Sequence, residues 1–263
     1  MLPLSAESTP NTPAELTEAL RRGLKELGLE PQQLDVQGES LGQLTSLRVD
    51  ISGNRLTREF RAPLPDSAGD TEVAIGQFDF LGSPVYFEGA PLDIRLNASG
   101  AKAGMAFTGG KGALVPKTAN SGDLTVEATR EALESFLNSI VVEAAKKQGF
   151  EVRKTHLEFT QEGPRAVSFR AEVTAKVFVM SASLALIGKL SIDDDLNARL
   201  SNLALDGDGM ILKLAGGFLK PRLDSLEGRS YSLVALIPGN LKLRDVELTA
   251  GNSLRVHAKF GAA

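Results

Sequence analysis

Alternating aliphatic residues constrain the fold of this chain more than any other feature. From Leu124 to Phe260 a long apolar-faced helix is followed by one alternating strand after another, then by a second apolar helix and more strands. Short turn signals such as Gly163-Pro164 separate neighbouring strand patterns and favour antiparallel pairing. The order differs from the strict strand–helix alternation of a parallel doubly wound fold. We therefore expect one α+β domain over residues 1–263.

A first helix is predicted over about residues 13–27. Thr12 is a typical cap and is followed by a proline in the first turn. Leu16, Leu20 and Leu24 then fall on one face. Strand patterns follow, and the stretch 98–120 is interpreted as two short strands with flexible turns around them.

Two later helices and one strand supply the candidate binding surface. One helix is predicted to begin near Thr125 and to end at Gly149. The other contains Pro221, which predicts a kink. A nearly continuous apolar run over 177–187 is interpreted as one buried strand. The candidate lipid-binding residues are Leu133, Phe136, Leu137, Ile140, Val141, Val177, Val179, Leu184, Leu186, Leu214, Phe218, Leu219 and Leu223.

Residues typical of catalytic or metal sites are sparse. The chain has no cysteine, which excludes disulfides, cysteine-based zinc sites and cysteine nucleophiles. Its two histidines, His156 and His257, lie far apart in separate predicted strands. The acidic runs at 193–195 and 206–209 lack the full calcium loop and are more typical of turns. There is no G-x-S-x-G elbow and no P-loop. We expect no enzymatic activity, no cofactor and no metal.

Charge and hydropathy restrict the classes of binding partner and the cellular compartments that we expect for this chain. The net charge of -4 argues against nucleic acid, since phosphate binding needs a basic surface. No segment approaches the roughly 20 apolar residues of a spanning helix. The start of the sequence has no signal-peptide pattern. As written, the chain is expected in the cytoplasm or peripherally on a membrane; if it is a trimmed mature form, the periplasm or cell envelope is expected. The oligomeric state stays open.

The apolar helix faces allow two functions of different classes. Small residues beside large ones, such as Ala144 and Gly216-Gly217, favour a groove that an acyl chain can enter. The alternative is a non-enzymatic structural or protein-interaction module whose core is filled at ordinary packing density. Cavity volume separates the two interpretations.

Several segments resemble the bacterial LmeA-like phospholipid-binding family. They are 190–196 (LSIDDDL), 203–209 (LALDGDG), the helix ending at 226–228 (LEG), 236–246 (LIPGNLKLRDV) and 44–52 (LTSLRVDIS). The resemblance implies a fold similar to tubular lipid-binding domains, in which a curved antiparallel sheet wraps long amphipathic helices. It also implies that the partner is a phospholipid or another acyl lipid, bound and possibly transferred. Lys213, Lys220 and Arg222 are candidates for contact with phosphate headgroups.

Overall fold

A computed structural model describes residues 1–57, 71–108, 111–146, 151–177, 180–207, 209–234 and 241–262. These residues form two compact units. Unit 1 comprises Met1–Val126, Val234–Asp245 and His257–Ala263; unit 2 comprises Glu127–Leu233 and Val246–Val256. The single domain over residues 1–263 expected from the sequence stays a prediction.

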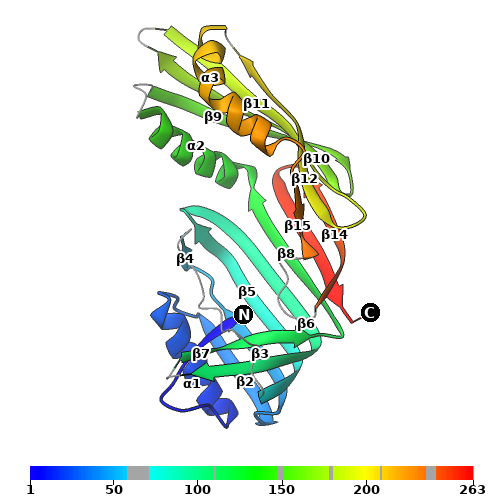
Figure 1. Ribbon diagram of the computed structural model, residues 1–263. Helices are drawn as coiled ribbons and strands as arrows, with labels where there is room; N and C mark the ends of the chain where they lie inside the picture. The colour runs from blue at the N-terminus through cyan, green and yellow to red at the C-terminus, as the bar shows by residue number, and fades with distance from the viewer. Residues whose placement is uncertain are drawn as a thin grey trace. The chain divides into compact units, whose positions relative to one another are not determined.

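Most of a large, mostly antiparallel sheet belongs to unit 1, whereas the 246–256 part of that sheet belongs to unit 2 (Figure 1). The strand order is β14-β15-β8-β6-β5-β3-β2; β7 pairs with β6 and β1, and β4 pairs with β5. The β3–β5 and β4–β5 pairings are parallel. The bounds are β1 Leu2–Ser5, β2 Gln33–Ser40, β3 Gln43–Asp50, β4 Arg55–Leu56, β5 Thr71–Phe87, β6 Ala90–Thr108, β7 Lys111–Thr118, β8 Ser121–Thr129, β14 Lys242–Ala250 and β15 Ser253–Gly261.

Helix α1, Pro13–Glu26, closes the core of unit 1. The Thr12 hydroxyl accepts a hydrogen bond from the Glu15 amide at 3.2 Å, so the predicted cap is confirmed. Leu16 and Leu20 on its inner face are 0% exposed. They pack with aliphatic side chains of β1, β3 and β5 in the main hydrophobic cluster of the unit. The innermost side chains of this cluster are therefore fully buried.

Gly23 sets the distance between α1 and β1. A Cβ at this position would lie 2.5 Å from the Pro3 carbonyl oxygen and 2.9 Å from the Leu4 nitrogen. Both atoms belong to the backbone, so relief requires the helix to move away from the strand. Close approach of helix to strand therefore depends on a residue without a side chain.

We expect Gly23→Ala to lower the free energy of unfolding by about 1–3 kcal/mol, because overpacking outweighs the better helix propensity of alanine. The matched control is Gly42→Ala, where nothing lies within 4 Å of the added Cβ. Urea denaturation followed by circular dichroism measures both variants. Equal stability of the two variants would contradict the close helix–strand contact.

Unit 2 contains a five-stranded antiparallel sheet of order β13-β12-β11-β10-β9 and two helices (Figure 1). Helix α2 packs along β9, and α3 packs on β12 and to a lesser extent on β11. The bounds are α2 Arg130–Lys146, β9 Glu151–Gly163, β10 Ala166–Val177, β11 Met180–Ile192, β12 Asn197–Gly207, α3 Gly209–Leu226 and β13 Ser230–Ser232.

The expected fold class is wrong. The described chain is mostly β-structure, and its three helices have only 14, 17 and 18 residues. No sheet wraps a long amphipathic helix among the described residues. The main reason lies in the stretch 98–120, where the predicted flexible turns are replaced by the 19-residue strand β6 and by β7. Gly100, at φ +56, lies inside β6, so the chain remains in the sheet there.

Two boundaries in unit 2 also differ from expectation. Thr125 lies in β8, and α2 begins five residues later, where the Thr129 hydroxyl accepts from the Ala132 amide at 3.2 Å. The run 177–187 is not one strand: Val177 ends β10 and pairs with Met180 at the start of β11. The helical assignment of α3 runs unbroken through Pro221. Pro238-Gly239-Asn240, a sequence that predicts a turn, lies outside the described residues.

Candidate functional site

One face of the unit 2 sheet is apolar across four strands. In register, Leu157 of β9 lies opposite Ala171 of β10, Ala171 opposite Leu186 of β11, and Leu186 opposite Leu205 of β12. Side chains two residues away point to the same side of a strand. We call this side the apolar face; its further members are Phe159, Val167, Phe169, Val173, Leu184, Leu190 and Leu200.

Gly188 keeps the centre of the apolar face free of a further side chain. It lies opposite Phe169 in the β10–β11 register. A Cβ there would lie 2.6 Å from Phe169 Cζ and 2.7 Å from Leu203 Cδ2. Two large apolar side chains from neighbouring strands therefore converge over the glycine.

The apolar face is only half-buried over most of its area. Leu157 and Val167 are 5% and 2% exposed, but Phe159, Phe169 and the Leu184–Leu186–Leu205 region are intermediate. The helix side chains are no better covered: Leu133, Phe136, Leu137 and Val141 of α2 and Leu219 and Leu223 of α3 are all half-buried. In unit 1, leucines of the same size reach 0% exposure. The apolar material of unit 2 is thus not sealed.

The predicted site residues are placed as follows. The six half-buried helix residues named in the preceding paragraph lie on α2 and α3, and Leu184 and Leu186 lie on the apolar face. Ile140, Leu214 and Phe218 belong to α2 and α3, but their side chains are outside the described part of the structure. Val177 lies at the end of β10, with its side chain likewise undescribed, and Val179 falls outside the described residues. Val177 is therefore not part of the strand that carries Leu184 and Leu186.

The opposite face of the same sheet is polar and paired. Arg170 lies 3.0 Å from Asp206 and 3.8 Å from Glu172, and Lys189 lies 2.5 Å from Glu162. The pKa of the Glu162 carboxyl is lowered, chiefly by its hydrogen bond with Lys189. The two faces of the sheet therefore differ sharply in polarity, and only one offers an apolar surface.

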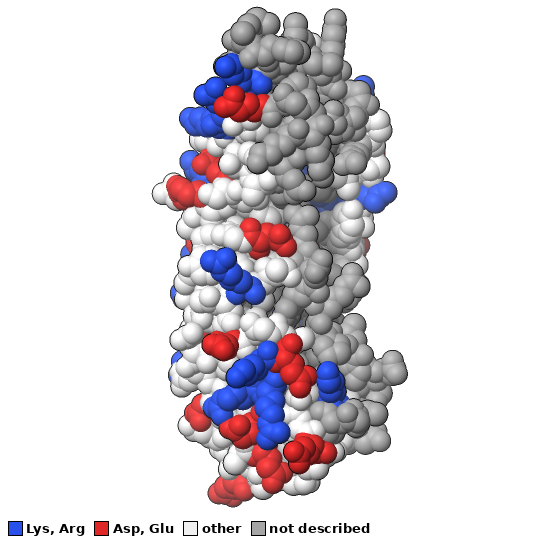
Figure 2. Space-filling view, turned by 90° about the vertical axis from the view of Figure 1, so that its left-hand side faces the viewer, with Lys and Arg blue, Asp and Glu red and all other residues white. Residues whose placement is uncertain are grey.

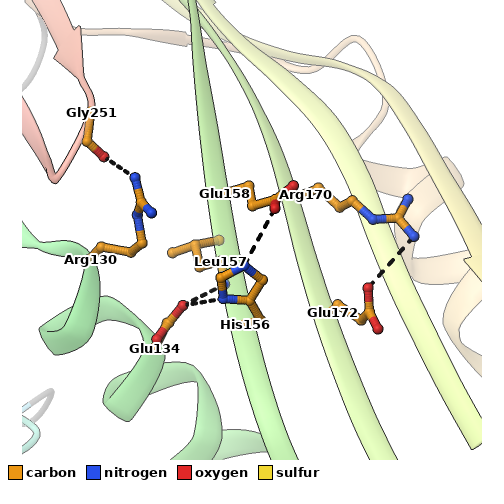
Figure 3. Close-up of polar contacts among 8 residues, drawn as sticks. All are labelled: Arg130, Glu134, His156, Leu157, Glu158, Arg170, Glu172 and Gly251. Atoms are coloured by element: carbon orange, nitrogen blue, oxygen red, sulfur yellow. Dashed lines mark hydrogen bonds and ion pairs between the residues drawn. The ribbon is translucent and has the colours of Figure 1, made fainter.

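A polar edge of α2 fixes the helix to the sheet. Glu134 Oε1 accepts from the Leu157 amide at 2.8 Å and lies 2.9 Å from His156 Nδ1 (Figure 3). His156 Nε2 is 3.4 Å from Glu158 Oε1. Leu157 lies on the edge strand β9, so Glu134 occupies a backbone donor that the sheet leaves unpaired.

Two further α2 residues on the same edge, Arg130 and Asn138, also make hydrogen bonds; they lie one turn before and one turn after Glu134. Arg130 donates from Nη2 to the Gly251 carbonyl at 2.7 Å and from its backbone amide to Asn252 at 2.9 Å (Figure 3). Asn138 accepts from the Thr155 hydroxyl at 3.0 Å. Residues four apart lie on one helix face, so these three side chains form one stripe.

Sequence reasoning missed this polar edge and most of the apolar face. Arg130, Glu134 and Asn138 recur at intervals of four, which is the one signal in the sequence that points to them. The alternating residues of β9 and β10 were interpreted as strands, but their common face with β11 and β12 depends on pairing. Only the register brings Leu157 into line with Leu205.

The acidic run at 193–195 lies in the turn between β11 and β12, whereas Asp206 and Gly207 end strand β12 and residue 208 lies outside the described residues. Asp193 accepts from the Asn197 amide at 2.8 Å in the β11–β12 connection, where Leu196 adopts φ +58. No group of three or more potential metal-ligating side chains occurs among the described residues. His156 and His257 lie in β9 and β15, in different units.

The Asp193 turn is expected to loosen in acid. Its hydrogen bond from the Asn197 amide holds the pKa of the Asp193 carboxyl below the ordinary value of 3.8. A lowered pKa means that the carboxylate stabilises the folded turn above pH 3.8 and that this contribution is lost as the pH falls through the lowered pKa. We expect the Asn197 amide resonance to titrate with a midpoint below 3.8 and to stop titrating in Asp193→Asn. A midpoint at or above 3.8 would contradict the hydrogen bond.

Charged side chains of both signs are mixed on the surface. Figure 2 shows acidic and basic groups interspersed with uncharged surface among the described residues of that face. Ion pairs such as Lys102–Glu72 and Lys111–Glu26 are about half exposed or more. Exposed pairs of this kind contribute little, so this surface does not define a site by charge.

Comparisons with protein families, curated proteins and solved structures find no match to this chain. The resemblance to the LmeA-like family therefore stays a prediction. No described helix has the length and apolar character needed to cross a membrane.

Proposed function

We propose that unit 2 binds the acyl chains of a phospholipid or another amphipathic lipid between its two helices and the apolar face of its sheet. The half-burial of that face carries the proposal. Leu186, Phe169 and Leu205 lie on the apolar face of a sheet against which both helices pack, yet they are only half-buried, whereas Leu16, Leu20 and Leu47 of unit 1 are 0% exposed.

The expected driving force is burial of hydrocarbon. Each methylene removed from water contributes about 0.8 kcal/mol, so one chain of ten methylenes gains about 8 kcal/mol before ordering costs. No charged contact with the headgroup is required for that gain. Lys220 is exposed on α3, while the side chains of Lys213 and Arg222 lie outside the described residues. Headgroup selectivity is therefore not part of the proposal.

Lipid uptake implies peripheral contact with a membrane. We also propose that the protein transfers lipid between membranes, because reversible lipid binding supports that activity. The polar edge of α2 keeps the helix attached to β9 while the apolar stripe exchanges protein contacts for lipid contacts. This attachment allows an open and a closed arrangement without detachment of the helix.

The test is extraction and exchange. Purified protein is extracted with organic solvent, and native mass spectrometry is recorded before and after incubation with phosphatidylcholine and phosphatidylglycerol vesicles. We expect adducts of lipid mass and transfer of a fluorescent phospholipid between vesicles. A protein that carries no lipid and accepts none from either vesicle would overturn the proposal and favour the filled-core interaction module.

A further inference from the structure

We infer that a proton on His156 strengthens the attachment of α2 to the edge of the unit 2 sheet, so that the helix is held more firmly in mildly acidic solution than at alkaline pH. His156 of β9 lies between two carboxylates (Figure 3). Its Nδ1 is 2.9 Å from Glu134 Oε1 of α2, and its Nε2 is 3.4 Å from Glu158 Oε1 of β9. We call these three side chains the His156 bridge.

The number of hydrogens on the ring decides how well the His156 bridge is satisfied. Both ring nitrogens face oxygens that, when ionised, only accept hydrogen bonds. A neutral imidazole has one N–H group, so it turns a lone pair toward one of the two carboxylates. The imidazolium ion has two N–H groups and donates toward both, and such charge-assisted contacts are stronger than neutral ones. The geometry is therefore that of a protonated ring.

The charges on β9 and β10 around the ring favour the same proton. The pairing of β10 with β9 places Glu172 directly opposite His156 and Arg170 opposite Glu158. Arg170 lies 3.8 Å from Glu172. Lys154, two residues before His156, lies on the same side of β9. With the carboxylate from α2, the glutamates around the ring outnumber the cations by one, and the imidazolium balances them.

Glu134 connects the His156 bridge to the attachment of the helix. It is the α2 carboxylate that meets the ring, whereas Arg130, one turn earlier, donates to the Gly251 carbonyl (Figure 3). The same Oε1 atom of Glu134 accepts a hydrogen bond from the Leu157 amide at 2.8 Å. The Glu134 side chain is 24% exposed, so loss of the neighbouring positive charge is only partly compensated by water. Deprotonation of His156 therefore weakens the hold of α2 on β9.

Proton linkage gives the direction of the effect. A state that binds more protons gains stability as the pH falls. The attached state keeps both carboxylates beside the ring, whereas a detached helix removes Glu134, so acid favours attachment. Histidine changes charge between about pH 5 and 8, and the attachment weakens as the pH rises through that range. The His156 side chain is 43% exposed, so we expect a change of about two- to fivefold.

The same proton regulates the lipid site proposed for unit 2, because α2 forms one wall of that site. A wall that is held less firmly opens more often, so acyl chains exchange faster at alkaline pH. This consequence rests on the proposed function, whereas the proton-linked attachment of α2 does not.

The Leu157 amide reports the attachment directly. It points outward from the edge strand, and Glu134 accepts its hydrogen bond. Hydrogen exchange is measured on the intact, lipid-free protein at about pH 5.5 and pH 8, and each rate is compared with the intrinsic rate at the same pH. Most glutamates stay ionised over this range. We expect Leu157 to be about two- to fivefold better protected at the lower pH, without the same change at the Leu186 amide inside the sheet.

Variants separate His156 from other sources of pH dependence. His156→Gln keeps a polar side chain that takes up no proton, and it should make the protection of Leu157 equal at the two pH values. His257→Gln is the matched control, since His257 Nδ1 lies 3.0 Å from the Thr125 hydroxyl in β8, and it should keep the full pH dependence. Glu158→Gln removes the charge beside Nε2 and should reduce the pH dependence while Leu157 stays protected.

Nitrogen NMR of the imidazole ring tests the hydrogen count. We expect both ring nitrogens of His156 to carry hydrogen at about pH 5.5. At pH 8 the remaining hydrogen should stay on Nδ1, because the contact of this atom with Glu134 is the shorter one. A neutral ring with its hydrogen on Nε2 would overturn the role given to Glu134.

Equal protection of Leu157 at the two pH values, or a pH dependence that survives in His156→Gln, would overturn the proton link. Transfer of a fluorescent phospholipid between phosphatidylcholine vesicles is compared at the same pH values. Faster transfer at pH 8 that is lost in His156→Gln supports regulation of the lipid site, and equal transfer rates would overturn it. Proton-linked protection without any lipid binding or transfer refutes the lipid site alone, and transfer without pH-dependent protection of Leu157 refutes the proton link alone.

Discussion

Replacement of Leu20 by alanine is expected to lower the free energy of unfolding of unit 1 by about 2–5 kcal/mol. Leu20 is 0% exposed on the inner face of α1 and belongs to the main cluster. Truncation removes buried methyl groups and leaves a void that the neighbouring strands fill only in part. Hydrogen exchange of the α1 and β1 amides measures the loss.

Glu18→Ala is the matched control for Leu20→Ala. Glu18 lies on the outer side of α1, 53% exposed and paired with Arg21, so its loss should cost within about 0.5 kcal/mol. Both variants change a residue of the same helix to alanine, which keeps the helix propensity comparable. A Leu20→Ala variant as stable as Glu18→Ala would mean that α1 does not close the core of unit 1.

Helix α1 shows what a sequence predicts well. Its cap, its first-turn proline and its apolar stripe are all encoded within 14 residues, and the structure reproduces each. Local signals suffice here because the cap, the proline and the apolar stripe all lie within the helix and its first flanking residue. The apolar stripes of α2 and α3 were predicted from the same kind of information.

Competition between local signals explains the misplaced start of α2. Thr125 and Thr129 are both followed by glutamate two residues later, so either residue is a candidate N-cap for the helix. Pairing of β8 within the large sheet extends the strand to Thr129 and leaves only the second signal for the helix. Strand pairing therefore decides between two candidate helix caps that the local sequence does not distinguish.

Strand register explains the wrong fold class and the missed face. In β5 and β6, Ile75 pairs with Ala101 and Gln77 pairs with Ser99, so the pairing continues across Gly76 and Gly100. In the sequence, these two glycines interrupt the alternation of apolar and polar residues and therefore predict the end of a strand. The apolar face of unit 2 requires the register of four strands at once. No local pattern specifies that Leu186 lies between Ala171 and Leu205.

Leu186→Asn is expected to weaken lipid binding by about tenfold or more. Burial of a leucine side chain is worth about 1.5–3 kcal/mol, and each 1.4 kcal/mol is a factor of ten in affinity. Leu186 lies on the apolar face between Ala171 and Leu205, where the proposed acyl chain makes contact. A fluorescent fatty acid displaced by phospholipid from the purified variant measures the change.

Ile187→Asn provides the control within the same strand. Ile187 is also half-buried, but it points to the polar face opposite Arg170. Because both substitutions place asparagine in β11, they perturb the strand similarly and differ only in the face they alter. We expect Ile187→Asn to retain lipid affinity within about twofold at a temperature where both variants are folded, whereas Leu186→Phe, which narrows the apolar face without adding a polar group, should lose it. Equal affinities of Leu186→Asn and Ile187→Asn would place the lipid elsewhere than on the apolar face.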